Sequence, residues 1–199
     1  SKLFDVDILD AEGPDLELPI PNGKRIQKNL VGKDIKNYDS MLVLSHFKGH
    51  PMGGFGGALK QLSIGCASSA GKANVHGAGK PEEMWTTEQN AFLESMADAA
   101  ESVVKLFDGK IVYINVMKNM SVDCDCCAVA EDPCMNDVGI LSSLDPVALD
   151  RACIDLVINS NDPGRDHFME RVNSRHGTHT IDTAEALGIG TQAYELVKV

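Results

Sequence analysis

The sequence has no apolar run near the roughly 20 residues that a membrane-spanning helix needs, and its first residues do not resemble a secretory signal peptide. Basic residues are also scarce, with 18 Lys and Arg against 29 Asp and Glu and a net charge of -11. This charge argues against non-specific binding to nucleic acid or to an anionic membrane. Six cysteines in 199 residues are too few for a small secreted disulfide scaffold, which favours a reducing cytoplasm.

Hydrophobic periodicity predicts strands that alternate with helices. The expected strands cover 41–45, 111–117, 138–141 and 192–199, and the expected helices cover 58–64, 86–107, 146–159, 163–172 and 180–186. Thr86 and Gln89 form a possible capping box for the longest helix, and Asp145-Pro146 opens the next one. We therefore predict an α/β fold, with a mainly parallel sheet and helices on both faces, in a single domain over residues 1–199.

Residues 1–40 are rich in turn-forming and charged residues, with short extended pieces expected at 4–9 and 16–20. This composition is more typical of the edge of a domain than of a complete one. The chain also begins without Met, which favours a processed or excised segment.

Four cysteines, Cys124, Cys126, Cys127 and Cys134, fall within eleven residues after the strand expected at 111–117. Acidic side chains are interspersed with them: Asp123, Asp125, Glu131, Asp132 and Asp137. These acids would raise the thiol pKa values unless a cation lay among them. The four cysteines are therefore candidate ligands of a metal ion or an iron–sulfur cluster, with Cys66 in reserve.

The geometry of the loop limits how many of these thiols can converge. In an extended backbone Cys124 and Cys126 share one face, while Cys127 points away. Three cysteines plus a histidine or Cys66 is therefore one option, and zinc and an iron–sulfur cluster both stay open. The spacing C-x-C-C-x6-C matches neither a ferredoxin run nor a zinc ribbon, and reduced structural thiols are the alternative. Cys153 is expected to be a small buried hydrophobic residue within a helix.

A second polar loop, at 46–57, follows the strand expected at 41–45 and contains His46 and His50. These histidines are candidates for metal ligation or for acid–base chemistry, and the alternative is two hydrogen-bonded loop histidines. Loops at the carboxyl ends of parallel strands meet at one edge of a sheet, so we expect this loop and the cysteine loop to converge.

The glycines of this loop, Gly53, Gly54, Gly56 and Gly57, precede a helix, with Lys60 and Lys72 nearby. Glycine lets backbone amides approach an anion, and the N-terminus of a helix favours negative charge. The loop is neither a Walker A motif nor a dinucleotide fingerprint, which leaves a small carboxylate or phosphate as its expected ligand. The alternative is a set of tight turns with close backbone packing.

Long stretches of the chain resemble a bacterial and archaeal family of unknown function, whose members are commonly described as uncharacterised Fe–S centre proteins. The resemblance is carried by residues 44–50, 54–60, 65–72, 123–127, 138–142, 145–150, 184–190 and 194–197. Family members usually have a further N-terminal α/β segment, which implies that this chain is a fragment or a truncated form. Many also carry a ferredoxin-like insert after the position of Lys72, and this sequence lacks that insert. The His/Gly loop additionally resembles a short part of the lactate racemase family.

Two functions follow from these observations as alternatives. The first is a protein that binds a metal or an iron–sulfur cluster, with a redox role and an unidentified redox partner. The second is a metal-dependent enzyme for a small carboxylate or related anion, with His46, His50 and Lys60 as candidate catalytic residues. A non-catalytic domain with merely reduced thiols is a third reading, so the sequence leaves open whether the protein is an enzyme.

Overall fold

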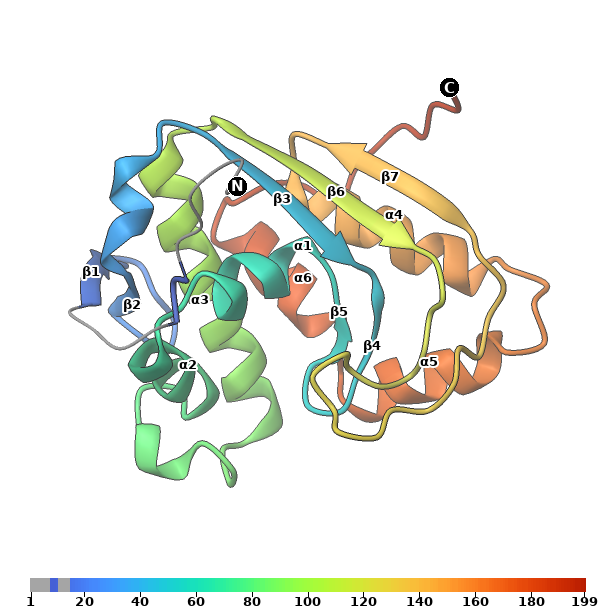
Figure 1. The fold of residues 1–199 in the computed structure, drawn as a ribbon, viewed down its shortest axis with the longest axis horizontal. Helices are drawn as coiled ribbons and strands as arrows, with labels where there is room; N and C mark the ends of the chain where they lie inside the picture. The colour runs from blue at the N-terminus through green and yellow to red at the C-terminus, as the bar shows by residue number, and fades with distance from the viewer. Residues whose placement is uncertain (1–7, 11–14) are drawn as a thin grey trace, which may run out of the picture.

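The computed structural model describes residues 8–10 and 15–199 of the chain (Figure 1). Its strands are β1 (Asp15–Pro19), β2 (Lys28–Gly32), β3 (Met41–His46), β4 (Lys48–His50), β5 (Gly54–Gly56), β6 (Ile111–Met117) and β7 (Gly139–Ser143). Its helices are α1 (Ala58–Lys60), α2 (Ser69–His76), α3 (Gln89–Phe107), α4 (Pro146–Ile158), α5 (Arg165–Ser174) and α6 (His179–Ala186). A π-helical turn, Gln61–Gly65, continues from α1, so the helix expected at 58–64 is present but irregular.

The sheets are small, and the prediction of a mainly parallel sheet is wrong. The largest sheet has three strands in the order β3-β6-β7, in which β3 and β6 are parallel and β6 and β7 are antiparallel. Two further sheets, β1-β2 and β4-β5, are two-stranded and antiparallel. Parallel neighbours need a long crossover, usually a helix, and α1 to α3 supply it between β3 and β6. The segment from β6 to β7 contains no helix, so β7 returns antiparallel.

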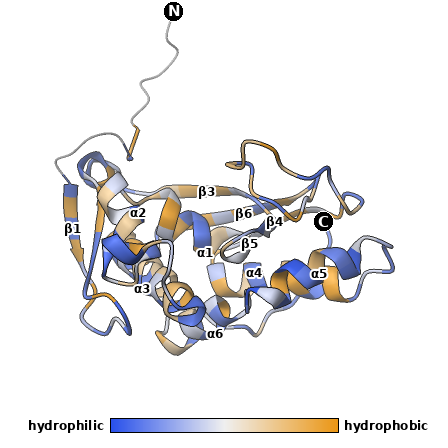
Figure 2. Cartoon of the chain, turned by 90° about the horizontal axis from the view of Figure 1, so that it is seen from below, coloured by the Kyte–Doolittle hydropathy of each residue, from blue (hydrophilic) through white to orange (hydrophobic). Residues whose placement is uncertain are grey.

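The prediction of helices on both faces of the sheet is also wrong. In Figure 2, α3, α4, α5 and α6 lie on the same side of β3 and β6. Val43 and Tyr113 point into the core on that side and are buried. On the opposite face Leu42 and Leu44 are each 61% exposed and Ile140 is 70% exposed, as expected for alternate residues of a sheet covered on one side only.

The two ends of the chain fit the sequence predictions unequally. The strand expected at 16–20 corresponds to β1, which pairs with β2, a strand that sequence analysis missed. Of the piece expected at 4–9, residues 4–7 lie outside the described part. The final strand expected at 192–199 is wrong, because these residues form neither a strand nor a helix.

The long helix α3 begins three residues later than the sequence predicted. Glu88, and not Thr86, caps it, because the Glu88 carboxylate accepts the backbone N–H groups of Asn90 and Ala91. By contrast, α4 begins as predicted, with Asp145 accepting the N–H groups of Val147 and Ala148. Both caps place a carboxylate on the free N–H groups at the start of a helix.

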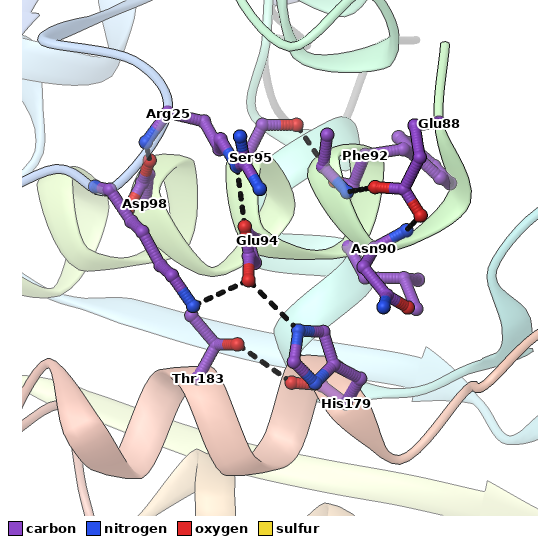
Figure 3. Close-up of polar contacts among 12 residues, drawn as sticks. Arg25, Glu88, Asn90, Phe92, Glu94, Ser95, Asp98, His179 and Thr183 are labelled. Carbon is purple, nitrogen blue, oxygen red and sulfur yellow. Dashed lines mark hydrogen bonds and ion pairs between the residues drawn. The ribbon is translucent and has the colours of Figure 1, made fainter.

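Two acidic residues of α3 attach the loop after β1 to the helix layer. Asp98 accepts the backbone N–H groups of Lys24, Arg25 and Ile26, at 2.8, 2.6 and 3.0 Å. Glu94 contacts the side chains of Lys24 and Arg25 and, at 3.0 Å, Nε2 of His179 in α6 (Figure 3). Because these partners come from two separate segments, the loop after β1 and helix α6, the two carboxylates of α3 hold both segments against this helix.

Candidate metal centre

The segment after β3 folds as a hairpin of β4 and β5, where sequence analysis expected an irregular loop. The cysteine loop that follows β6, yellow in Figure 1, runs beside this hairpin. The backbone N–H of Gly49 donates to the carbonyl of Ser121 at 2.8 Å. A Cβ atom at Gly49 would lie 2.3 Å from the carbonyl oxygen of Val122, so only glycine allows this approach. The predicted convergence of the two loops is therefore present.

Three side chains converge between the hairpin and the cysteine loop: His50, Cys124 and Cys126. A ring nitrogen of His50 and the two Sγ atoms all lie within 4.8 Å of one another. The two Sγ atoms are 2.6 Å apart, and the backbone N–H of Cys126 points at Sγ of Cys124 at 3.3 Å. His50 and Cys124 are buried, whereas Cys126 is exposed. This group brings together donor types that could hold a metal ion, and its exposed member gives access from solvent.

The ring of His50 is fixed by the turn of its own hairpin. Its Nδ1 accepts the backbone N–H groups of Met52 and Gly53, at 3.2 and 3.0 Å. Burial, followed by the charges of Lys60 and Lys48, lowers the pKa of His50 to about 3, so the ring is neutral and carries its proton on Nε2.

Without a cation, the thiol of Cys126 is held in its protonated form. Burial, together with the contact to Cys124, raises the pKa of Cys126 to about 11, and the charge of Lys60 only partly opposes this. A bound metal ion reverses such a shift, because a coordinating thiol loses its proton outright. The deprotonated form of Cys126 is therefore favoured when a divalent cation is bound and disfavoured when the site holds no cation.

His46, a predicted ligand or acid–base group, lies next to this group but does not join it. Its Nδ1 is 3.0 Å from a carboxylate oxygen of Asp125, and its Nε2 is 2.7 Å from the carbonyl oxygen of Lys118. Asp125 also forms an ion pair with Lys48 at 3.1 Å. Burial raises the pKa of Asp125, but the hydrogen bonds from His46 and Lys48 outweigh it and hold the pKa below its usual value. Both nitrogens of His46 thus have protein partners, which is the hydrogen-bonded alternative considered from the sequence.

The remaining cysteines lie outside the group. Cys127 follows a turn in which its N–H donates to the carbonyl of Cys124 at 2.9 Å, and Cys134 points at the carbonyl of Met120 at 3.4 Å. Cys66 belongs to the hydrophobic core, and burial raises its pKa to about 12. Cys153 is a buried core residue, as predicted. All six cysteines are free thiols.

The glycine loop does not offer the helix N-terminus that its sequence indicated for an anion. The N–H groups of Ala58 and Leu59, at the start of α1, donate to the carboxylate of Asp150 at 2.8 and 3.0 Å. Gly57 permits this contact, because a Cβ there would lie 2.4 Å from Oδ1 of Asp150. An acid of the chain itself thus fills the anion position, while Gly53, Gly54 and Gly56 form the buried hairpin. Lys72 forms an ion pair with Asp10.

Sequence analysis missed two residues that shape this region. Asp150 is fully buried, and burial raises its pKa to about 6 despite its hydrogen bonds. Lys48 was not singled out, although it lies two residues from both His46 and His50. That spacing puts the three side chains on one face of an extended segment, which was the available signal.

Comparison with known proteins supports a family assignment. The profile of a domain of unknown function, DUF362, matches residues 2–155, well over half of the 199 residues. The chain belongs to the DUF362 family. No curated protein and no solved structure matches this DUF362 chain significantly. Among its described residues, no helix is both long enough and apolar enough to cross a membrane.

Proposed function

We propose that this protein binds a single divalent metal ion through Cys124, Cys126 and His50. The observation that carries the proposal is the convergence of these three donors, from segments far apart in the chain, within 4.8 Å. Two thiolates and one imidazole are a donor set that zinc accepts, and soft thiolates select for it. A cytoplasmic location belongs to the same proposal, because the six free thiols need a reducing compartment.

An iron–sulfur cluster is the less favoured occupant. Cubane and rhombic clusters are normally held by four thiolates, and among the described residues Cys124 and Cys126 are the two cysteines in the group whose ligand atoms lie within 4.8 Å of one another. Cys127 and Cys134 lie in the same loop but outside the group, and Cys66 lies in the core. A redox role would then need a redox-active ion such as iron in the same three-donor site, because zinc does not change its oxidation state.

A metal-dependent enzyme is the second candidate, and the number of donors favours it. Structural zinc sites usually close with four protein ligands, whereas catalytic sites keep three and leave one position for water or substrate. Cys126 is exposed, so an ion held here is accessible from solvent.

Anaerobic metal analysis tests the proposal. Protein purified without oxygen and supplied with Zn²⁺ and Fe²⁺ should retain about one ion per chain, without the visible absorption of an iron–sulfur cluster. Replacement of Cys124 or Cys126 by Ser should abolish retention, whereas Cys134→Ser, in the same loop, should leave it unchanged. Folded protein that retains no metal would refute the proposal, and a cluster spectrum that depends on Cys127 and Cys134 would replace it with a cluster site.

A further inference from the structure

A cavity of about 250 Å³ lies where the turn of the β4-β5 hairpin, the end of α2, the start of α3 and the end of α5 meet. None of the three proposed metal ligands lines it. Its volume is just below the roughly 300–1,000 Å³ that is typical of sites for drug-sized ligands. The cavity is therefore sized for a small molecule.

The walls of this cavity are held together by the side chain of Gln89. Its Nε2 donates to the backbone carbonyl of Met52, in the hairpin turn, at 2.8 Å and to that of Arg175, at the end of α5, at 2.9 Å. Because an amide nitrogen carries two N–H donors, Gln89 fixes the hairpin and the end of α5 against the start of α3. The cavity is thus formed by the fold itself, as is usual for small-molecule sites.

Aromatic rings make up much of the cavity wall. His76 stacks on the buried Phe92, with ring centroids 5.0 Å apart and 17° between the ring planes. Nδ1 of His76 lies 2.7 Å from the carbonyl oxygen of Lys72, to which it donates its proton. Trp85, the one tryptophan of the chain, also lines the cavity and is 77% exposed. A ring this large and this exposed gains contact area when a ligand covers it.

Arg175 gives the cavity wall one positive charge without a protein partner. The chain has five arginines, and four of them form ion pairs with acids: Arg25, Arg151, Arg165 and Arg171. Arg175 forms no ion pair with any described residue. Burial lowers the pKa of His76 and outweighs its hydrogen bond to Lys72, so the imidazole stays neutral at pH 7. Among the described residues that line the cavity, none is acidic.

We propose that this cavity binds a small aromatic carboxylate, whose ring lies against Trp85 and whose carboxylate pairs with Arg175. A planar ring matches the aromatic wall, because ring–ring contacts stabilise a complex beyond the area they bury. A carboxylate matches the guanidinium group, which can donate two parallel hydrogen bonds to it. One unpaired positive charge favours a ligand with one negative charge over a phosphate dianion.

This site does not depend on the proposed metal site, although the two are neighbours. The N–H of Met52, whose residue lines the cavity, donates to Nδ1 of His50 at 3.2 Å. A ligand in the cavity therefore lies against the backbone turn that orients His50. Binding measured with and without a chelator separates the two proposals, because the carboxylate site needs no metal ion.

The fluorescence of Trp85 tests the proposal directly, because the chain has no other tryptophan. Benzoate added at constant ionic strength should give a saturable change in emission, both with and without a chelator. We expect Arg175→Gln to bind benzoate at least about tenfold more weakly, because hydrogen bonds between charged groups are lost. Arg175→Lys should recover part of this affinity. Arg165→Gln, at the other end of α5, alters an arginine that is already paired with Asp166 and should bind benzoate as the wild type does.

Isothermal titration calorimetry extends the test to variants of Trp85 itself. Trp85→Phe should keep most of the affinity for benzoate, and Trp85→Ala should lose at least about fivefold, because the ring contact is removed. Trp85 is exposed, so neither replacement removes a core side chain.

Ligand analogues decide which feature of benzoate is recognised. Benzamide has the ring without the charge, and cyclohexanecarboxylate has the charge without the flat ring. Each should bind at least about tenfold more weakly than benzoate. Equal binding of benzamide, or wild-type affinity in Arg175→Gln, refutes the pairing with Arg175. Equal binding of cyclohexanecarboxylate, or wild-type affinity in Trp85→Ala, refutes the aromatic contact.

Two further outcomes overturn the whole assignment. Benzylamine is a cation of similar shape, and tighter binding of benzylamine than of benzoate refutes an anion site. No saturable binding of benzoate up to about 10 mM removes the site altogether, since a ligand of this size reaches that affinity even with a modest binding energy per atom.

Discussion

Cys124 and Cys126 approach each other through both their side chains and their backbone. Their Sγ atoms lie 2.6 Å apart, and the N–H of Cys126 points at Sγ of Cys124. Cys124 is buried against the core and Cys126 faces solvent, so the pair joins the interior to the surface. His50, from a separate hairpin, completes the group and ties two parts of the chain together. A metal ion bound at this proposed site would therefore stabilise the fold.

Addition of metal should raise the free energy of unfolding. An ion that binds only the folded state stabilises it by about 2.7 kcal/mol at a free concentration one hundred times Kd. We expect this gain in thermal or denaturant unfolding of the wild type with zinc, measured against the same protein with chelator. Cys124→Ser should lose the gain and Cys134→Ser should keep it. Equal stabilisation of both variants would show that zinc acts elsewhere.

Gly49→Ala should weaken metal binding by moving the hairpin away from the cysteine loop. The new Cβ would lie 2.3 Å from the carbonyl oxygen of Val122, and backbone on both sides leaves it little room to relax. We expect a cost of about 1–3 kcal/mol in the free energy of unfolding and a loss of about tenfold or more in zinc affinity. Both are measurable by denaturation and by competition with a chromophoric chelator.

Gly53→Ala is the matched control in the same hairpin. A Cβ there meets no atom closer than 3.4 Å, and the N–H that donates to His50 is retained. This variant should bind zinc as the wild type does. Wild-type affinity in Gly49→Ala would refute the close approach of Gly49 to Val122.

Asp150 should make the free energy of unfolding depend on pH. Burial raises its pKa from 3.8 to about 6, so the folded state holds a proton that the unfolded chain releases. Its contribution to stability is therefore complete below pH 3.8, is lost as pH rises to about 6, and is constant above.

The comparison of wild type with Asp150→Asn isolates this contribution. The wild type minus variant difference in the free energy of unfolding of metal-free protein should shrink by up to about 3 kcal/mol between pH 4 and pH 7. Chemical denaturation at a series of pH values measures it. A difference that stays constant or grows over this range would contradict the raised pKa.

The contribution of Glu94 to the free energy of unfolding should change with pH in the opposite direction to that of Asp150. Burial raises its pKa, but hydrogen bonds from Lys24, His179 and Arg25 outweigh this and lower it from 4.5 to about 2. Its contribution is present above pH 4.5 and is lost as pH falls toward 2.

Glu94→Gln should therefore destabilise the protein by about 2 kcal/mol at pH 7 and by less at pH 3. The cost at pH 7 takes into account that the side chains of its partners are partly exposed to solvent, which weakens their interaction with Glu94. Glu17→Gln, which removes an exposed pair with Lys28, should cost no more than about 1 kcal/mol. Equal costs for the two variants at pH 7 would show that Glu94 does not hold the loop after β1 and helix α6 against α3.

The elements that sequence analysis predicted well are those with local signals. The start of α4 follows from Asp145 and Pro146, and β6 follows from one apolar run, because caps and periodicity involve neighbouring residues. The direction of β7 was not predictable in this way. It depends on whether the segment after β6 crosses the sheet, and the parallel sheet was inferred from the alternation of elements alone.

In the candidate site, too, some features follow from the sequence and others depend on the folded chain. The sequence by itself determined that Cys124 and Cys126 lie two residues apart in one loop, because spacing along the chain does not depend on packing. The turn that closes from Cys124 to Cys127 and brings the two Sγ atoms together is a property of the folded chain. Only the tertiary structure decided that His50 joins them while His46 turns to Asp125, that Asp150 fills the start of α1, and that Lys60 has no acidic partner among the described residues. These outcomes depend on burial and on contacts between distant segments, and both exist only once the chain has packed.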